Sequence, residues 1–363
     1  MINVSGSPEP TELNLAFDGS AREYFRVWIV NLCLTLVTFG IFSAWAKVRK
    51  KRYIYSHTSL GGTPFQYLAR PIPILKGRLI AAAGFGVYFI CSRFVTSLMP
   101  YVLVAGLVAA PWVLSRSIAF NARFSAYRNM RFGFDGSYVD ALKTLYAWAI
   151  VPLFAVGVVF NFKGQVYIMA ISSLILSFHF PWLIRRVKKF MVEHTLFGGK
   201  RGEFSATGGQ FFKIYFVSGL IVLAAVIPVA ILFGVLTAVF EWKPIHPIVP
   251  VLPIYAAYVV AYAYLKARGG NLSWNNIRLG PLTFHSTMLS RDLIKLYFAN
   301  ALGIVFSFGL LIPWAVIRTY KYRVDHIQVI QTGTLYQFRG SEQQAVSAAG
   351  VETMDVFDMD LSL

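Results

Sequence analysis

Residues 38–57 read TFGIFSAWAKVRKKRYIYSH, and they place Trp45, Arg49, Tyr53 and His57 at steps of four residues. On an α-helix, side chains at this spacing lie along one slowly drifting face. An apolar run precedes the stretch, and a polar, Gly-rich stretch follows it. The pattern therefore predicts a helix that leaves a membrane at its Trp and Arg and ends in the cytoplasm near its His.

The same spacing recurs later in the chain, with a shorter version at Trp112, Arg116 and Phe120. The first and last copies also match upstream at a constant offset, where Asn31 corresponds to Asn300. Such a constant offset predicts an internal repeat produced by duplication. The two further full copies are Trp182, Arg186, Phe190 and His194, and Trp314, Arg318, Tyr322 and His326.

The composition is that of a membrane protein, because 56% of residues are hydrophobic and only 14% are charged. Soluble domains carry about 25% charged residues. A membrane-spanning helix needs about 20 apolar residues. We therefore expect an α-helical polytopic membrane protein with six clear spans. These lie near residues 78–97, 99–119, 141–161, 165–184, 212–236 and 247–266.

The net charge of +18 is distributed unevenly along these spans. Of the 34 Lys and Arg residues, only Arg93, Lys163 and Lys243 lie near the short links within the three span pairs. Because Lys and Arg mark cytoplasmic loops, the asymmetry predicts three hairpins that enter from the cytoplasm and return to it. Both termini are then cytoplasmic. Membrane anchoring explains the basic charge, so we expect no nucleic-acid partner.

The first and last apolar segments, 24–47 and 293–317, allow two topologies. Each is long enough to span once, but basic residues flank both of its ends. A single span would place the last motif outside, against the charge rule. A re-entrant hairpin that turns near Gly40 or Gly309 keeps the motifs inside and needs its turn buried in protein. The total is six to eight membrane segments.

Short β-hairpins are expected after the histidines, because Gly pairs separate β-prone runs there. Together these pieces predict a small cytoplasmic β-rich cap, since isolated two-stranded hairpins are marginally stable. The hairpins are expected at 54–67, 192–206 and 326–338, with turns at Gly61-Gly62, Gly198-Gly199 and Thr332-Gly333. Further strands are expected at 12–18, 127–135 and 274–285.

The chain thus divides into six expected segments, each built around membrane helices or strands. They are 1–69 (first strand, motif and hairpin), 70–138 (membrane hairpin and strand), 139–210 (membrane hairpin, second motif and β-hairpin), 211–290 (membrane hairpin and strand), 291–340 (last membrane segment, third motif and β-hairpin) and 341–363 (an acidic tail).

The sequence resembles the YjgN-like family of bacterial inner-membrane proteins, a domain of unknown function. The resemblance covers essentially the whole chain and implies an integral inner-membrane protein, without an activity or catalytic residues to transfer. The middle copy departs from the pattern, with Ser172, Ser173 and His179 in place of the Asn and Gly. The matching residues are Phe17-Asp18-Gly19, Tyr24-Phe25, Asn31, Thr38-Phe39-Gly40-Ile41, Ala44 to Arg49, Arg52-Tyr53, Gly77-Arg78 and the Asp-rich tail.

The Trp, Arg, aromatic and His stripes have two interpretations. They either anchor the helices in the interface and bind anionic headgroups, or converge on one polar ligand site. Asn31 and Asn300 likewise either satisfy neighbouring helices or line a substrate site. The three histidines lie too far apart in sequence to announce a metal site, and no catalytic motif is present. We therefore expect no metal, no cofactor and no catalytic residues.

Three functions fit this sequence. The first is transport, a channel or lipid handling without covalent chemistry, because transporters often contain repeats. The second is a membrane scaffold that acts through the cap and the acidic tail. The third is an intramembrane enzyme that uses His57, His194 and His326. The expected partners are anionic lipids at the cytoplasmic face, a small-molecule or lipid substrate, and a second copy of the chain.

Overall fold

The computed structural model describes residues 11–146, 166–240, 249 and 251–332 of the chain. Its helices are α1 (Ala21–Val37), α2 (Ser43–Ser56), α3 (Pro71–Phe94), the 3₁₀ turn η1 (Thr96–Leu98), α4 (Met99–Phe124), α5 (Tyr138–Tyr146), α7 (Val166–Glu193), α8 (Gly208–Phe240), α9 (Leu252–Trp274), α10 (Ser290–Phe306) and α11 (Ile312–Asp325). Its strands are β1 (Thr11–Leu13), β2 (Leu15–Phe17), β3 (Thr58–Leu60), β4 (Thr63–Tyr67), β5 (Ser125–Tyr127), β6 (Met130–Phe134), β7 (Thr195–Phe197), β8 (Lys200–Phe204), β9 (Ile277–Leu279), β10 (Leu282–Ser286) and β11 (Ile327–Gln331).

The described strands form one eleven-stranded sheet that closes on itself. They pair in the order β1-β11-β10-β9-β8-β7-β6-β5-β4-β3-β2, and all the pairs are antiparallel. The first and last strands of this order, β1 and β2, are consecutive in the chain with only Asn14 between them. One N-terminal segment therefore joins both edges and gives a barrel-like sheet without a long open edge.

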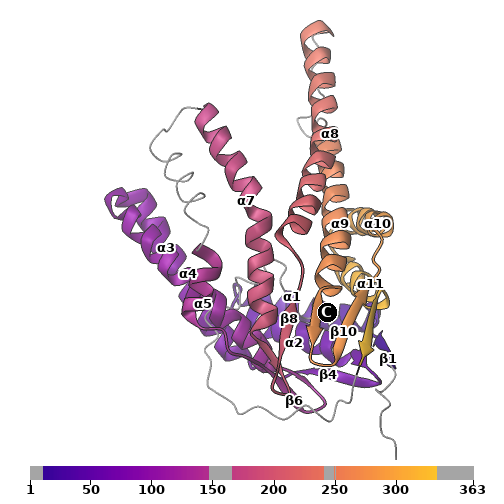
Figure 1. The fold of residues 1–363 in the computed structure, drawn as a ribbon. Helices are drawn as coiled ribbons and strands as arrows, with labels where there is room; N and C mark the ends of the chain where they lie inside the picture. Colours follow the sequence, from indigo (N-terminus) through magenta and orange to yellow (C-terminus); the bar gives the residue numbers. More distant parts are fainter. Residues whose placement is uncertain (1–10, 147–165, 241–248, 250, 333–363) are drawn as a thin grey trace, which may run out of the picture.

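Helices and strands alternate regularly along the chain. A two-stranded hairpin follows each of α2, α4, α7 and α9, and the next helix starts where that hairpin ends. The long helices α3, α4, α7, α8 and α9 rise from the same side of the sheet, whereas α10 and α11 lie close to it (Figure 1). The sheet thus forms a base from which the apolar helices project.

Three helices of the described residues are long and apolar enough to cross a membrane. They are Pro71–Phe94, Thr96–Phe124 and Gly208–Phe240. The spans expected at 165–184 and 247–266 fall on α7 and α9. Most of the span expected at 141–161, and the links at 162–164 and 237–246 in large part, lie outside the described residues.

The first and last apolar segments form helical hairpins with matching turns. Phe39 and Gly40 have φ of 49° and 89°, and Phe308 and Gly309 have φ of 50° and 90°. The Gly40 amide donates its hydrogen to the carbonyl oxygen of Thr35 at 2.8 Å, and the Gly309 amide donates to the carbonyl oxygen of Ile304 at the same distance. Glycine suits this left-handed turn because it has no Cβ. The chain reverses at the glycines, as the hairpin alternative expects.

The eleven-stranded sheet is larger than the expected cap of three hairpins and three further strands. The hairpins around Gly61-Gly62 and Gly198-Gly199 are present. However, 127–135 and 274–285 are not single strands, because each region belongs to a further hairpin, β5–β6 or β9–β10. Arg128 and Asn129 form the first of these turns with positive φ, without a Gly pair that would announce it. Gly333, of the third expected turn, lies outside the described residues.

Five helix-to-strand joints share one hydrogen bond in the part of the chain that the structure describes. In the first, Asp18, which follows β2, donates its amide hydrogen to the carbonyl oxygen of His57, which ends α2 and precedes β3. The bond extends the antiparallel ladder by one residue onto the helix end. The other four are Leu68 to Phe124 (2.8 Å), Asp135 to His194 (3.1 Å), Ser205 to Asn276 (3.1 Å) and Thr287 to His326 (3.0 Å).

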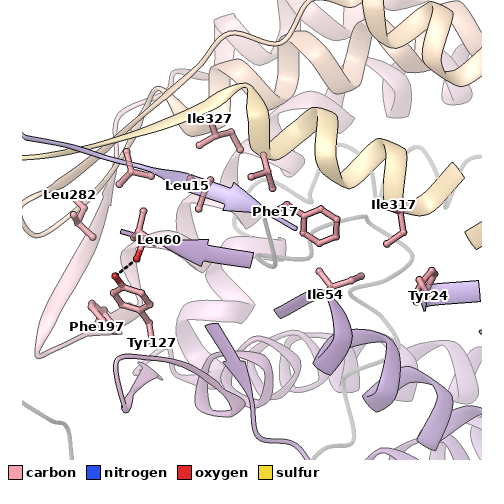
Figure 2. Close-up of a cluster of buried hydrophobic side chains, with 12 residues drawn as sticks. Leu15, Phe17, Tyr24, Ile54, Leu60, Tyr127, Phe197, Leu282, Ile317 and Ile327 are labelled. Carbon is pink, nitrogen blue, oxygen red and sulfur yellow. Dashed lines mark hydrogen bonds between the residues drawn. The ribbon is translucent and has the colours of Figure 1, made fainter. Parts of the chain in front are cut away.

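The interior of the sheet is an apolar core with a cavity of about 170 Å³. Side chains from several strands and from α2 and α11 gather there (Figure 2). The Tyr127 hydroxyl donates to the carbonyl oxygen of Leu60 at 2.8 Å. Thr58 and Thr195 donate their hydroxyls to carbonyls of their own preceding helices. Polar groups at the wall are thus satisfied, which buried hydroxyls require.

We predict that Gly202→Ala destabilises the fold. Gly202 lies in β8, and a Cβ there would collide with the carbonyl oxygen of Val192 at the end of α7. Because backbone cannot move aside cheaply, we expect a loss of about 1–3 kcal/mol. At Gly209 a Cβ meets nothing within 4 Å, so Gly209→Ala is the control. Thermal unfolding of the purified protein in detergent measures both, and equal midpoints would contradict the prediction.

Candidate functional site

The three stripes of Trp, Arg, aromatic and His lie on three different helices, α2, α7 and α11. Trp45 packs against the buried cluster of α2, α3 and α4. Trp182 packs on Phe212 of α8 with ring centroids 5.0 Å apart. Trp314 lies under the guanidinium of Arg318, which is 5.0 Å from the ring centroid. Each Trp thus has its own neighbours, and the interpretation of the stripes as one shared ligand site stays a prediction.

The histidines of the stripes close the helix ends. The Nδ1 atoms of His57, His194 and His326 lie 2.7, 3.0 and 2.8 Å from the carbonyl oxygens four residues earlier. Because a carbonyl only accepts, each Nδ1 carries the hydrogen. Each ring also packs on the aromatic residue of its own stripe. Within the described residues no group of three His, Cys, Asp or Glu could hold a metal ion.

The aromatic residues of the two outer stripes fasten neighbouring helices. The Tyr53 hydroxyl accepts the Ser20 amide hydrogen at 2.9 Å, where α1 begins. The Tyr322 hydroxyl accepts the Leu289 amide hydrogen at 3.0 Å, where α10 begins. Arg186 of the middle stripe donates to the carbonyl oxygen of Lys143 in α5 at 3.4 Å. These contacts place the stripe residues in structural roles.

The two asparagines differ although their helical hairpins match. Both are buried, with 6% of their surface exposed. The Asn31 Oδ1 accepts a hydrogen bond from Arg49 at 3.2 Å. The corresponding Arg318 instead lies over Trp314, and Asn300 Oδ1 is buried without a partner in the part of the chain that the structure describes. Asn31 therefore links α1 to α2 through its Oδ1, whereas the Oδ1 of Asn300 accepts no hydrogen bond from the described residues.

The orientation of the Asn300 amide is set by its neighbours. Its Nδ2 donates to Thr319 Oγ1 at 3.1 Å and reaches Ala315 O at 3.4 Å. The Thr319 hydroxyl already donates to Ala315 O at 2.7 Å, so it can only accept from Asn300. Both neighbours therefore require the NH₂ group on this side. The oxygen must point the other way.

Asn300 lines an open groove of about 650 Å³ between α9, α10 and α11, here called the Asn300 groove. Pockets that bind small ligands typically measure about 300–1,000 Å³. Apolar residues and five tyrosines form most of its walls, and Lys50 and Arg323 add positive charge. The tyrosines are Tyr255, Tyr258, Tyr262, Tyr297 and Tyr320. The Tyr297 hydroxyl is also buried without a hydrogen-bond partner among the described residues.

Further cations lie beside this groove on the inner faces of the helices. Lys188 donates to the Ser273 hydroxyl at 2.8 Å. The Lys266 ammonium lies 5.1 Å from the ring centroid of Tyr262, a groove residue. Lys188 lies beyond the expected span 165–184, and burial, followed by the positive charge of Arg323, lowers its pKa to about 8. An anion in the groove would meet an excess of positive charge.

The cations at and beside the groove and Tyr297 are not predicted from the sequence. Lys188, Lys266 and Arg323 come from helices far apart in the chain, and no spacing rule links them. The sequence contains only a weak indication of a site, because each of these three cations lies in a helix that also has an apolar face. In α7, Ser172 is buried, and His179 Nε2 is buried without a partner in the described residues. The acidic tail lies outside the described residues.

Comparisons with known proteins agree with the membrane character. The family described as "Bacterial protein of unknown function (DUF898)" matches residues 12–356. Inner membrane protein YjgN of Salmonella typhimurium is 24% identical over 91% of this chain and 91% of its own length. Inner membrane protein YjgN of Escherichia coli K12 is 27% identical over 44% of this chain and 40% of its own. No solved structure matches the chain.

We predict that the stripe histidines stabilise the fold. His326→Ala removes the bond to the Tyr322 carbonyl, and we expect a loss of about 1 kcal/mol. His285→Ala on the exposed side of β10 is the control and should change stability little. Unfolding of both variants in detergent measures the difference. A variant at His326 that keeps the full stability would show that the bond is dispensable.

Proposed function

The chain is a bacterial inner-membrane protein of the YjgN-like DUF898 family, and from this premise we propose that it is a multi-pass protein that binds an anionic lipid in the Asn300 groove. The groove carries this proposal, because it joins apolar, tyrosine-rich walls to Lys50 and Arg323. Binding a lipid there is the first step of lipid handling or transport, and it needs no covalent chemistry.

The multi-pass arrangement is supported by the helix surfaces. The long helix α8 exposes its apolar side chains all around, including Leu223, Ile231 and Leu232. In water such surfaces would be strongly unfavourable. The sequence adds six apolar runs, with the basic residues at their sheet-side ends. We place the sheet and both termini in the cytoplasm, since Lys and Arg concentrate there.

The two short helical hairpins fit partial entry into the cytoplasmic leaflet. The tip residues Phe39 and Phe308 are each 98% exposed, and α1 and α10 have 17 residues each. Such a helix is about 26 Å long, which is shorter than the hydrocarbon core of about 30 Å. The exposed rings suit insertion into lipid. We therefore propose eight apolar segments, of which six span and two re-enter.

Internal duplication accounts for the matching hairpins. The turn at Gly40 and the turn at Gly309 share dihedral angles and hydrogen bonds. The helices α1 and α10 have 17 residues each, and α2 and α11 have 14 each. Independent origin of so many identical details is improbable. We propose that the chain arose from repeated helix-pair and hairpin units, with the long pairs in the middle.

An anionic lipid matches the groove better than a fully polar solute. Tyr255, Tyr258 and Tyr262 are 63, 56 and 48% exposed, so the side of the groove formed by α9 opens outward to where we place the bilayer. A lipid could enter sideways and leave its tails in the membrane. Arg323 is half-buried beside Lys188 and Lys266, where a phosphate would relieve the mutual repulsion of the cations.

We predict that Arg323→Ala weakens anionic-lipid binding. Loss of a charged hydrogen bond corresponds to roughly tenfold to hundredfold in affinity. Arg318→Ala on the same helix is the matched control, because Arg318 is exposed over Trp314 and does not line the groove. Native mass spectrometry of the protein with phosphatidylglycerol measures bound lipid. Equal loss in both variants, or in neither, would overturn the proposed site.

We predict a defined labelling pattern for the topology. In a variant without Cys33 and Cys91, Lys243→Cys in the expected outer link should react with a membrane-impermeant maleimide on intact spheroplasts. Glu203→Cys, exposed on β8, should react only after the cells are broken. Labelling of Glu203→Cys on intact spheroplasts would show that the sheet faces the periplasm.

A further inference from the structure

We propose that the Asn300 groove selects anionic lipids whose head group carries free hydroxyls, the phosphatidylglycerol class. The inference rests on the proposed lipid binding and deepens it by naming the head group. It starts from Asn300, whose buried Oδ1 has no partner among the described residues and which lines a groove with cations for a phosphate.

The buried acceptor requires a donor from the ligand. Only 6% of the Asn300 surface is exposed, and its Nδ2 donates to Thr319. Its Oδ1 is therefore the amide atom without a partner among the described residues. A buried polar atom without a partner is unfavourable, and the ligand that supplies a hydrogen gains the difference. Phosphate oxygens only accept at neutral pH when the phosphate is a diester. The hydrogen must therefore come from another part of the head group.

A second unpartnered group lies on the same helix face. Tyr297 precedes Asn300 by three residues, a spacing that makes side chains neighbours on a helix. Its hydroxyl is buried without a partner among the described residues, and a phenol hydroxyl can both donate and accept. An acceptor and a donor–acceptor side by side match the two adjacent hydroxyls of a glycerol head group. Arg323 and Lys50 in the same groove match its phosphodiester.

In the first helical hairpin, the corresponding asparagine, Asn31, has its acceptor occupied by a hydrogen bond. There Arg49 donates to Asn31 Oδ1 at 3.2 Å, so this acceptor is used within the protein. At the equivalent position Arg318 lies over the Trp314 ring, and Asn300 Oδ1 is buried without a partner among the described residues. The difference between two otherwise matching hairpins singles out the last one as the binding copy. It also makes Asn31→Leu a matched control for Asn300→Leu.

The test compares two lipids that differ only in the hydroxyls. Full-length protein in nanodiscs of phosphatidylcholine receives increasing phosphatidylglycerol or phosphatidylethanol, which has the same phosphodiester charge but no free hydroxyl. Native mass spectrometry counts the lipid that stays bound. We expect about tenfold preference for phosphatidylglycerol, since one hydrogen bond to a buried group has this effect. Asn300→Leu should remove the preference and leave Arg323-dependent binding of both lipids.

The outcomes separate the inference from the proposed function. Equal binding of the two lipids by the unchanged protein, or a preference that survives Asn300→Leu, would overturn the hydroxyl selection while lipid binding stands. Failure of both lipids to bind would overturn both. Tyr297→Phe keeps the ring and removes only the hydroxyl, so a reduced preference in this variant supports the site even where Asn300→Leu fails to fold. Competition by soluble glycerol 3-phosphate without lipid retention would assign the site to a free phosphate and overturn the lipid.

Discussion

The hydrogen bond between a helix-end carbonyl and the amide that follows a neighbouring strand is the constraint on which the architecture depends. It occurs at five joints in the described residues, for example from Asp18 to His57. Because the bond continues a strand ladder onto the helix, it sets where each helix stops and how it is rotated above the sheet. The histidine rings stabilise three of these joints, and Phe124 and Asn276 take their place in α4 and α9. These hydrogen bonds therefore join the sheet and the helices that rise from it into one continuous structure.

The joints also determine which side chains meet between helices. Lys51 lies six residues before its joint and donates to Asn121, which lies three residues before the next joint. Lys188 and Ser273 repeat this relation between α7 and α9. Between α4 and α7 the same two positions hold the apolar residues Ile118 and Met191. A fixed rotation thus brings cations to the inner faces of the helices, although the contacts join residues 70 and 85 positions apart.

Local patterns predict much of this fold, and long-range contacts explain the rest. The reversal at Gly40 and the turn at Gly198-Gly199 follow from glycine and the flanking apolar runs. The hairpin at Arg128 and Asn129 was expected as one strand, because no Gly pair announces its turn. Closure of the sheet and the joints at α4 and α9 depend on pairing between distant segments. The sequence predicts Asn300 as a candidate polar residue, but it does not predict which helices surround it to form the groove.

The first and last helical hairpins match in their turns but differ in their side-chain contacts. In α9 the residue six positions before the joint is Gly270, which has no side chain to meet Arg323 of α11. Arg323 is then available to the groove. In the same hairpin Arg318 lies over Trp314 instead of satisfying Asn300, whereas Arg49 keeps that bond in the first hairpin. These two differences therefore leave Arg323 at the groove and Asn300 Oδ1 without a partner among the described residues. The hydrogen bond from Thr287 to His326, which joins α11 to the sheet, is kept.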